Sequence, residues 1–184
     1  MTSLVHASPV DAAGKARPGY SITRVTGKTV DCLTPSPSAV RVDVVACGST
    51  ADDADVCWVE PDRAKVLCEI SPWDKELREF TSSGMIHKMT VPAQPLAWAV
   101  VLQGGDKCVR RIGGAVDSLP FGIIPAYYCQ DQNRMIVVGA DGKLFDKSSA
   151  RWTVQTIDEP EAVKAGSAYK LPPRESVVTA YFAD

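Results

Sequence analysis

The chain has 184 residues, of which 45% are hydrophobic and 23% charged, enough for one folded domain with a hydrophobic core. Its formal net charge of −2 argues against the basic face on which nucleic-acid-binding proteins depend, so we predict no nucleic-acid partner. The longest apolar run, Leu96–Leu102, has the length of a strand and is too short for a membrane span, so none is predicted.

The first residues have the composition of a linker. Residues 1–18 contain Ser, Pro, Gly and Ala with little periodicity, which predicts a flexible N-terminal tail before a single β-rich domain over residues 19–184. Neither the basic segment nor the apolar segment of a secretory signal peptide is visible at the start. If the cysteines are paired the protein must be exported, and we then expect that a signal peptide has been removed.

Strand signals dominate the next part of the chain. Alternation is weak over Tyr20–Val25 and clearer over Val40–Cys47, where alternate valines would share one face. The prolines of the segment 34–38 predict a loop between these two strands.

A hairpin is predicted around the turn Pro61–Ala64. Folding the chain about the centre of this turn brings the strand Cys57–Glu60 against the strand Lys65–Cys68. Cys57 then lies directly opposite Cys68, at a separation that a disulfide bond can span with a small adjustment.

One segment has the signals of a helix. Ser71 is a suitable N-cap, with Pro72 at the first helical position and Asp74 in the first turn. The residues 75–80 are mostly good helix formers, so we expect one short helix here. A single helical turn over residues 160–166 is a second candidate.

Two further hairpins are predicted from glycine-containing turns. A turn at Gly104-Gly105 would place Val101 opposite Cys108 and Trp98 opposite Arg111. A turn at Asp141-Gly142 would join the strand 135–138 to the strand 144–145. Other strands are expected over residues 86–91, 126–129, 152–157 and 176–182.

Six cysteines, with wide and uneven spacing, favour a disulfide framework over a zinc site or a redox dithiol, which use Cys-x2-Cys. The alternative is a set of six reduced, buried thiols. The simplest pairing is sequential, although a register argument supports the middle pair alone. The pairs are Cys32–Cys47, Cys57–Cys68 and Cys108–Cys129. The resulting fold class is mainly β: an antiparallel β-sandwich or irregular barrel with one short helix, stapled by disulfides.

Catalytic motifs are scarce. His87 is the one histidine outside the first 18 residues, so a histidine-based metal site is not predicted, and a surface role for His87 is favoured. No Gly-x-Ser-x-Gly elbow or phosphate-binding loop is present in the sequence. We therefore predict no cofactor and assign no catalytic residue.

Acidic residues offer two weaker hypotheses. Asp52, Asp53 and Asp55 could hold calcium, but the segment lacks the EF-hand spacing, so a solvated loop is favoured; Asp141 and Asp146 receive the same interpretation. Carboxylate pairs for a hydrolase could come from Asp74, Glu76 and Glu79, whose alternative role is a solvated surface.

Aromatic and cationic residues in the middle of the chain could bind a protein or glycan partner. The alternative is that the aromatic residues belong to the core, with an internal cation–π contact. The candidate ligand-binding residues are Trp98, Arg110, Arg111, Tyr127 and Tyr128.

The segment Cys108–Gly114 followed by Ala126–Cys129, and the ending formed by Arg151–Val154 and Val177–Phe182, resemble small exported proteins of mycobacteria and related actinobacteria. The resemblance covers about half of the chain. It implies export and disulfide bonds and carries no catalytic residues.

Several functions remain open at this point. The first is a secreted or cell-envelope protein without catalytic activity that binds a partner or has a structural role. The second is a secreted hydrolase that uses a carboxylate pair. The third is an inhibitor that presents the loop Leu119–Pro125.

Overall fold

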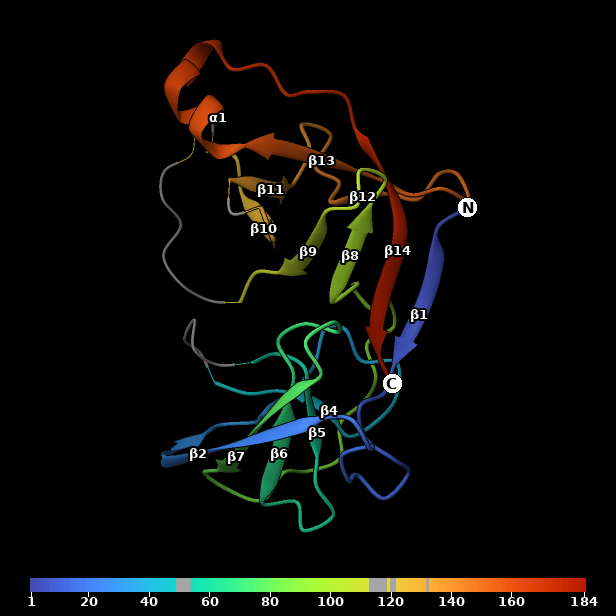
Figure 1. Cartoon of the computed structure of the whole chain (residues 1–184), viewed down its shortest axis with the longest axis vertical. Helices are drawn as coiled ribbons and strands as arrows, with labels where there is room; N and C mark the ends of the chain where they lie inside the picture. The colour runs from blue at the N-terminus through green and yellow to red at the C-terminus, as the bar shows by residue number, and fades with distance from the viewer. Residues whose placement is uncertain (49–53, 113–118, 120–121, 132) are drawn as a thin grey trace. The chain divides into compact units, whose positions relative to one another are not determined.

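A computed structural model describes residues 1–48, 54–112, 119, 122–131 and 133–184, and shows a mainly β chain (Figure 1). Its contacts divide it into two compact units. Unit 1 comprises Met1–Val5 and Ala99–Ala180, and unit 2 comprises His6–Trp98 and Tyr181–Asp184. Each unit therefore combines segments from distant parts of the chain.

Unit 1 is built around a barrel of six strands, which confirms the expected irregular barrel. The strands β8, β9, β10, β11 and β13 are neighbours in that order, and β14 pairs with both β8 and β13, which closes the ring. The strands β1 and β12 extend the same sheet at β14 and β13. The bounds are β1 Ser3–Ala7, β8 Ala99–Leu102, β9 Lys107–Arg110, β10 Pro125–Cys129, β11 Arg134–Val137, β12 Phe145–Asp146, β13 Thr153–Asp158 and β14 Glu175–Ala183.

Unit 2 contains a six-stranded sheet with the order β2-β7-β6-β5-β4-β3. The pair β2–β7 is parallel, and the other pairs are antiparallel. Its hydrophobic core gathers around two disulfide bonds and includes Val45, Val66 and Phe80. The bounds are β2 Ser21–Val30, β3 Thr34–Pro35, β4 Val44–Ala46, β5 Cys57–Val59, β6 Lys65–Cys68 and β7 Glu76–Ser82.

The N-terminal residues differ from the predicted flexible tail over 1–18. Residues 3–7 form β1, and the buried hydroxyl of Thr2 donates a hydrogen bond to the carbonyl of Val177, with 2.7 Å between the oxygens. Val10 is fully buried. Backbone pairing and these two anchors order a segment whose composition alone is typical of a linker.

All three sequential disulfide bonds are present: Cys32–Cys47, Cys57–Cys68 and Cys108–Cys129. Two of them join directly opposed residues of adjacent strands. Cys57 faces Cys68 between β5 and β6, as the hairpin predicted, and Cys108 faces Cys129 between β9 and β10. Four of the six cysteines are thus part of the strand pairing itself.

The Gly104-Gly105 turn forms, but the predicted register is wrong by one residue. Val100 faces Cys108 and Val101 faces Lys107. The amide of Leu102 donates to the carbonyl of Asp106, so the loop has one residue more than the predicted two-residue turn. Gly105, at φ 93°, takes the left-handed conformation with which such loops end.

The Asp141-Gly142 turn also forms, but the strands on its two sides do not pair with each other. The amide of Gly139 donates to the carbonyl of Lys143 across the turn. The strand β11 pairs instead with residues 155–158 of β13, and β12 pairs with residues 153–154 of the same strand. Both arms of the predicted hairpin therefore pair with the distant strand β13 and not with each other.

The helix predicted from Ser71 onward is wrong. The hydroxyl of Ser71 donates to the carboxylate of Asp74, Lys75 is left-handed at φ 50°, and the following residues form β7. β7 pairs on both sides, with β2 and β6, and buries Leu77 and Phe80. Sheet pairing and burial override the local helix preference.

The helix of the described residues is α1 (Glu159–Ala165), close to the second helical candidate, and the 3-10 turn η2 (Gly166–Ala168) follows it. Asp158 caps α1 by accepting a hydrogen bond from the amide of Glu161. No helix in the described part of the chain has the length and apolarity to cross a membrane.

The remaining strand predictions have mixed outcomes. The strands over 126–129, 152–157 and 176–182 correspond to β10, β13 and β14. Residues 86–91 form no strand, because Ile86 instead exchanges hydrogen bonds with Arg63 through its amide and carbonyl. Of residues 40–47 only 44–46 are a strand, since Asp43 is left-handed at φ 65°.

Candidate functional site

A pocket with a volume of about 660 Å³ lies in unit 1. Three segments line it: the loop before β10, the loop after β11, and η2 with the loop that follows it. This volume falls within the range of about 300–1,000 Å³ that is typical of small-molecule sites. The lining residues are Gly122, Ile123, Ile124, Val138, Gly139, Ala140, Ser167, Tyr169, Lys170 and Leu171.

The barrel core holds the inner wall of this pocket in place. Ile123, Tyr169 and Leu171 are partly buried and pack against a core cluster that includes Met135 and Ile157. The same three residues also line the pocket. The amide of Val138 donates to the carbonyl of Ile124, which joins the two loops that flank the β10–β11 pair.

Polar contacts fix the position of the loop that follows η2. The side-chain amide of the buried Gln155 donates to the carbonyl of Pro172, with 2.6 Å between nitrogen and oxygen. Arg174 donates to the carbonyls of Leu144 and Thr153 and forms an ion pair with Asp141. The rim is therefore anchored to β13 and to the Asp141 turn.

The ion pair between Arg174 and Asp141 passes so close to Gly139 that a side chain at this position would not fit. A Cβ atom at this position would lie 2.7 Å from a guanidinium nitrogen of Arg174 and 2.8 Å from a carboxylate oxygen of Asp141. A larger residue would have to displace the ion pair. The ion pair and the pocket lining at Gly139 thus depend on each other.

The chemical character of the pocket is apolar with a few polar groups at the rim. Most of the lining surface is apolar, with isoleucine, valine and leucine side chains among its residues, and Ile124 is 58% exposed. The polar side chains are the hydroxyls of Ser167 and Tyr169 and the ammonium group of Lys170. Such a lining suits a small, mainly apolar molecule with one anionic or hydrogen-bonding group.

The aromatic and cationic residues predicted as a ligand surface are divided between the two units, and two of the aromatic rings are fully buried. Trp98 belongs to unit 2 and is fully buried, where its indole nitrogen donates to the carbonyl of Ile70. Tyr127 is fully buried in unit 1 and meets the ring of Phe145 edge-on. Burial raises the pKa of the Tyr127 phenol, so it stays neutral. These two rings follow the alternative interpretation as core residues.

The other three candidates lie on the β9–β10 side of unit 1. Arg110 faces Tyr127 across the strand pair, and burial lowers the pKa of its guanidinium. Arg111 is partly buried, and Tyr128 is 40% exposed. None of the three lines the described pocket.

The acidic candidates are distributed among separate polar contacts. Glu79 forms ion pairs with Lys65 and Arg24. Asp74 and Glu76 both line a small pocket of about 110 Å³, which is well below the usual size of a ligand site.

Of the remaining acidic candidates, Asp146 caps a turn and Asp55 is buried. A hydrogen bond from the amide of Ser148 lowers the pKa of Asp146, which is consistent with a solvated turn. Asp55 is buried, whereas Asp52 and Asp53 lie outside the described residues.

Among the described residues, the side chains close enough to share a metal ion are Cys47, Cys57 and Cys68. All three sulfur atoms are already in disulfide bonds, so they offer no thiolate ligand in this state. His87 is exposed on the surface and is not part of the group.

The described residues of the loop 119–125 contribute to the barrel core and to the pocket lining. Leu119 is buried in the barrel core, Ile123 and Ile124 line the pocket, and Pro125 begins β10. Pro120 and Phe121 lie outside the described residues.

The sequence does not mark the pocket, because the three segments that line it are far apart in the chain and none contains a motif. The paired isoleucines Ile123-Ile124 in a loop were the one available signal. Comparisons of the chain with protein-family models, with curated proteins and with solved structures gave no match.

Proposed function

We propose that the protein is an exported, non-catalytic binding protein that takes a small, mainly apolar ligand with an anionic group into the unit 1 pocket. The observation that carries this proposal is the pocket of about 660 Å³ with a largely apolar lining. Its walls are held by the barrel core and by the hydrogen bonds of Gln155 and Arg174. A preformed site of this kind loses little entropy when a ligand binds.

Export is supported by the three disulfide bonds. Bonds of this kind form and persist in oxidising compartments and are rare in the cytosol. A binding protein of the cell envelope or the extracellular space is consistent with this chemistry.

The preference for an anionic ligand follows from the charges of the lining. Lys170 contributes an ammonium group, and the ten lining residues include no aspartate or glutamate. An anionic group near Lys170 would gain Coulomb energy and a charge-assisted hydrogen bond, with the Ser167 and Tyr169 hydroxyls as further donors.

The location of the site is tested by filling it. Ala140 lines the pocket and is exposed, so Ala140→Phe should occupy ligand space without disturbing the core. We expect the affinity for the apolar anion 1-anilinonaphthalene-8-sulfonate, measured by isothermal titration calorimetry, to fall about tenfold or more, which is about 1.4 kcal/mol.

Ala150→Phe is the matched control for this substitution. Ala150 is an exposed alanine of the same unit and is not among the lining residues. Equal affinities of Ala140→Phe and wild type would show that the dye binds elsewhere and would refute the proposed site.

The role of Lys170 is tested with a charged and a neutral probe of similar shape. Lys170→Gln should weaken binding of the anilinonaphthalene sulfonate about three- to fivefold, since an exposed ion pair contributes roughly 1 kcal/mol. Binding of the neutral N-phenyl-1-naphthylamine should be unchanged. Lys164→Gln, which removes an exposed charge from α1, is the control. Equal losses for both probes would contradict the anion preference.

A further inference from the structure

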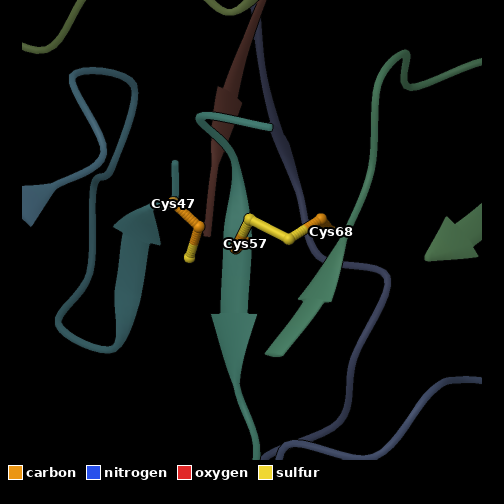
Figure 2. Close-up of side chains that lie close together, drawn as sticks. All are labelled: Cys47, Cys57 and Cys68. Atoms are coloured by element: carbon orange, nitrogen blue, oxygen red, sulfur yellow. A yellow bond between two sulfur atoms is a disulfide. The ribbon is translucent and has the colours of Figure 1, made fainter. Parts of the chain in front are cut away.

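Two disulfide bonds of unit 2 lie in direct contact inside its core. The sulfur atoms of Cys47, Cys57 and Cys68 all lie within 4.8 Å of one another. Figure 2 shows the Cys57–Cys68 bond between β5 and β6, with Cys47 beside it. Since Cys47 is bonded to Cys32, a second disulfide bond is adjacent to the first.

The two bonds differ in the pocket that lies beside their flanking residues. A pocket of about 290 Å³ is lined by Asp31 and Leu33, which flank Cys32, and by Ala46 and Gly48, which flank Cys47. Apart from Ala46, these flanking residues are exposed. No residue next to Cys57 or Cys68 lines a described pocket. All four cysteines are buried, with Cys32 and Cys47 at 2% and Cys57 and Cys68 at most 1% exposed. The Cys32–Cys47 bond is therefore the outer bond and Cys57–Cys68 the inner bond.

We propose that Cys47 and the inner bond form a thiol–disulfide exchange site, with a small thiol as the external co-reactant. The thiolate of the co-reactant attacks Cys32 at the outer bond, forms a mixed disulfide with it and releases Cys47 as a thiolate. Cys47 then attacks the sulfur of Cys57 or Cys68. A new bond from Cys47 to that sulfur replaces the inner bond, and the other cysteine leaves as a thiolate that takes up a proton.

Electrons balance in this sequence, because each step exchanges one disulfide bond for another. The net result moves the free thiol from the outer bond to a cysteine of β5 or β6. The surrounding core residues, including Val45, Val59 and Val66, keep the sulfur atoms close together during the exchange. The inference is independent of the ligand pocket, which belongs to unit 1.

Cys32→Ser tests the exchange directly, because it leaves Cys47 as a permanent thiol beside the inner bond. The monomeric variant is incubated at pH 8, alkylated with iodoacetamide and digested without reduction, and its disulfide-linked peptides are identified by mass spectrometry. We expect a Cys47–Cys57 or Cys47–Cys68 peptide, with the alkyl group on the remaining cysteine of the inner pair. Cys108→Ser is the matched control, since it leaves Cys129 as a thiol in unit 1 and should show the alkyl group on Cys129 alone.

Two outcomes would overturn the proposal. One is alkylation of Cys47 alone in Cys32→Ser, with the inner bond intact after hours at pH 8. The other is a set of crossed bonds that includes Cys108 or Cys129, which would show that exchange requires unfolding.

Partial reduction of the wild type provides a second measurement that does not depend on the folding of a variant. Substoichiometric tris(2-carboxyethyl)phosphine cleaves a disulfide at both pH 5 and pH 8, whereas exchange needs a thiolate, whose ordinary pKa is about 8.5. We expect crossed Cys47 peptides at pH 8 and a simply reduced outer bond at pH 5. Crossed peptides in equal amounts at both pH values, or at neither, would contradict the proposed mechanism.

Discussion

Glu69 is a buried carboxyl group at the end of β6. It is 1% exposed, and neither of its carboxylate oxygens has a hydrogen-bond partner among the described residues. Burial, with a further contribution from the charge of Asp74, raises the pKa of Glu69 to about 8. The charge of Glu69 in turn raises the pKa of the Tyr20 phenol, after the larger effect of burial. Glu69 is therefore neutral in the folded protein at neutral pH.

This burial makes the free energy of unfolding depend on pH. Between its ordinary pKa of 4.5 and about 8, Glu69 keeps its proton in the folded state and releases it in the unfolded state. Because the folded state then binds more protons, stability falls as pH rises, by up to about 1.4 kcal/mol per pH unit. Glu69→Gln removes this contribution, so we expect it to gain stability relative to wild type from pH 5 to pH 8.

Urea unfolding at a series of pH values measures this difference. Glu76→Gln is the control, because Glu76 is an exposed glutamate of the neighbouring strand β7, and its pH profile should follow that of the wild type. Parallel pH profiles of Glu69→Gln and wild type would show that Glu69 is ionised in the folded state.

At the scale of strands and turns, local signals were sufficient where the partners are close in sequence. The Pro61–Ala64 turn predicted both the hairpin and the Cys57–Cys68 bond, because this short turn joins the two strands directly and places Cys57 opposite Cys68. The Gly104-Gly105 turn was located but not its register, because a loop of one more residue uses the same glycine conformation.

Where a distant segment competes, local signals failed. The strand β13 takes the edge of β11 that the Asp141-Gly142 hairpin required. The helix signals at Ser71 and Asp74 were satisfied within a turn, and β7 gained pairing partners on both sides instead. The pocket was not predicted for the same reason, since its lining is defined only when three distant loops meet at the barrel.

At the scale of the whole molecule, the last residues of the chain are part of unit 2. The amide of Ala183 donates to the carbonyl of Ser38, and the carbonyl of Asp184 accepts a hydrogen bond from the indole of Trp58. Phe182 is 6% exposed and meets the ring of His6 edge-on. Each unit also has its own hydrophobic cluster. Because each unit has its own cluster, we expect a core substitution in one unit to lower the stability of that unit first.

Phe182→Ala tests this independence. Removing a buried phenylalanine side chain should cost about 3–5 kcal/mol, and we expect the loss in unit 2, although Phe182 is more than a hundred residues from most of it in sequence. Hydrogen exchange followed by mass spectrometry should show faster exchange in β5 and β6, with β10 and β11 little changed. Val178→Ala on the same strand is the control, because Val178 is 45% exposed and belongs to unit 1. Equal acceleration in both units would mean that they unfold as one cooperative structure, and that the two clusters are energetically a single core.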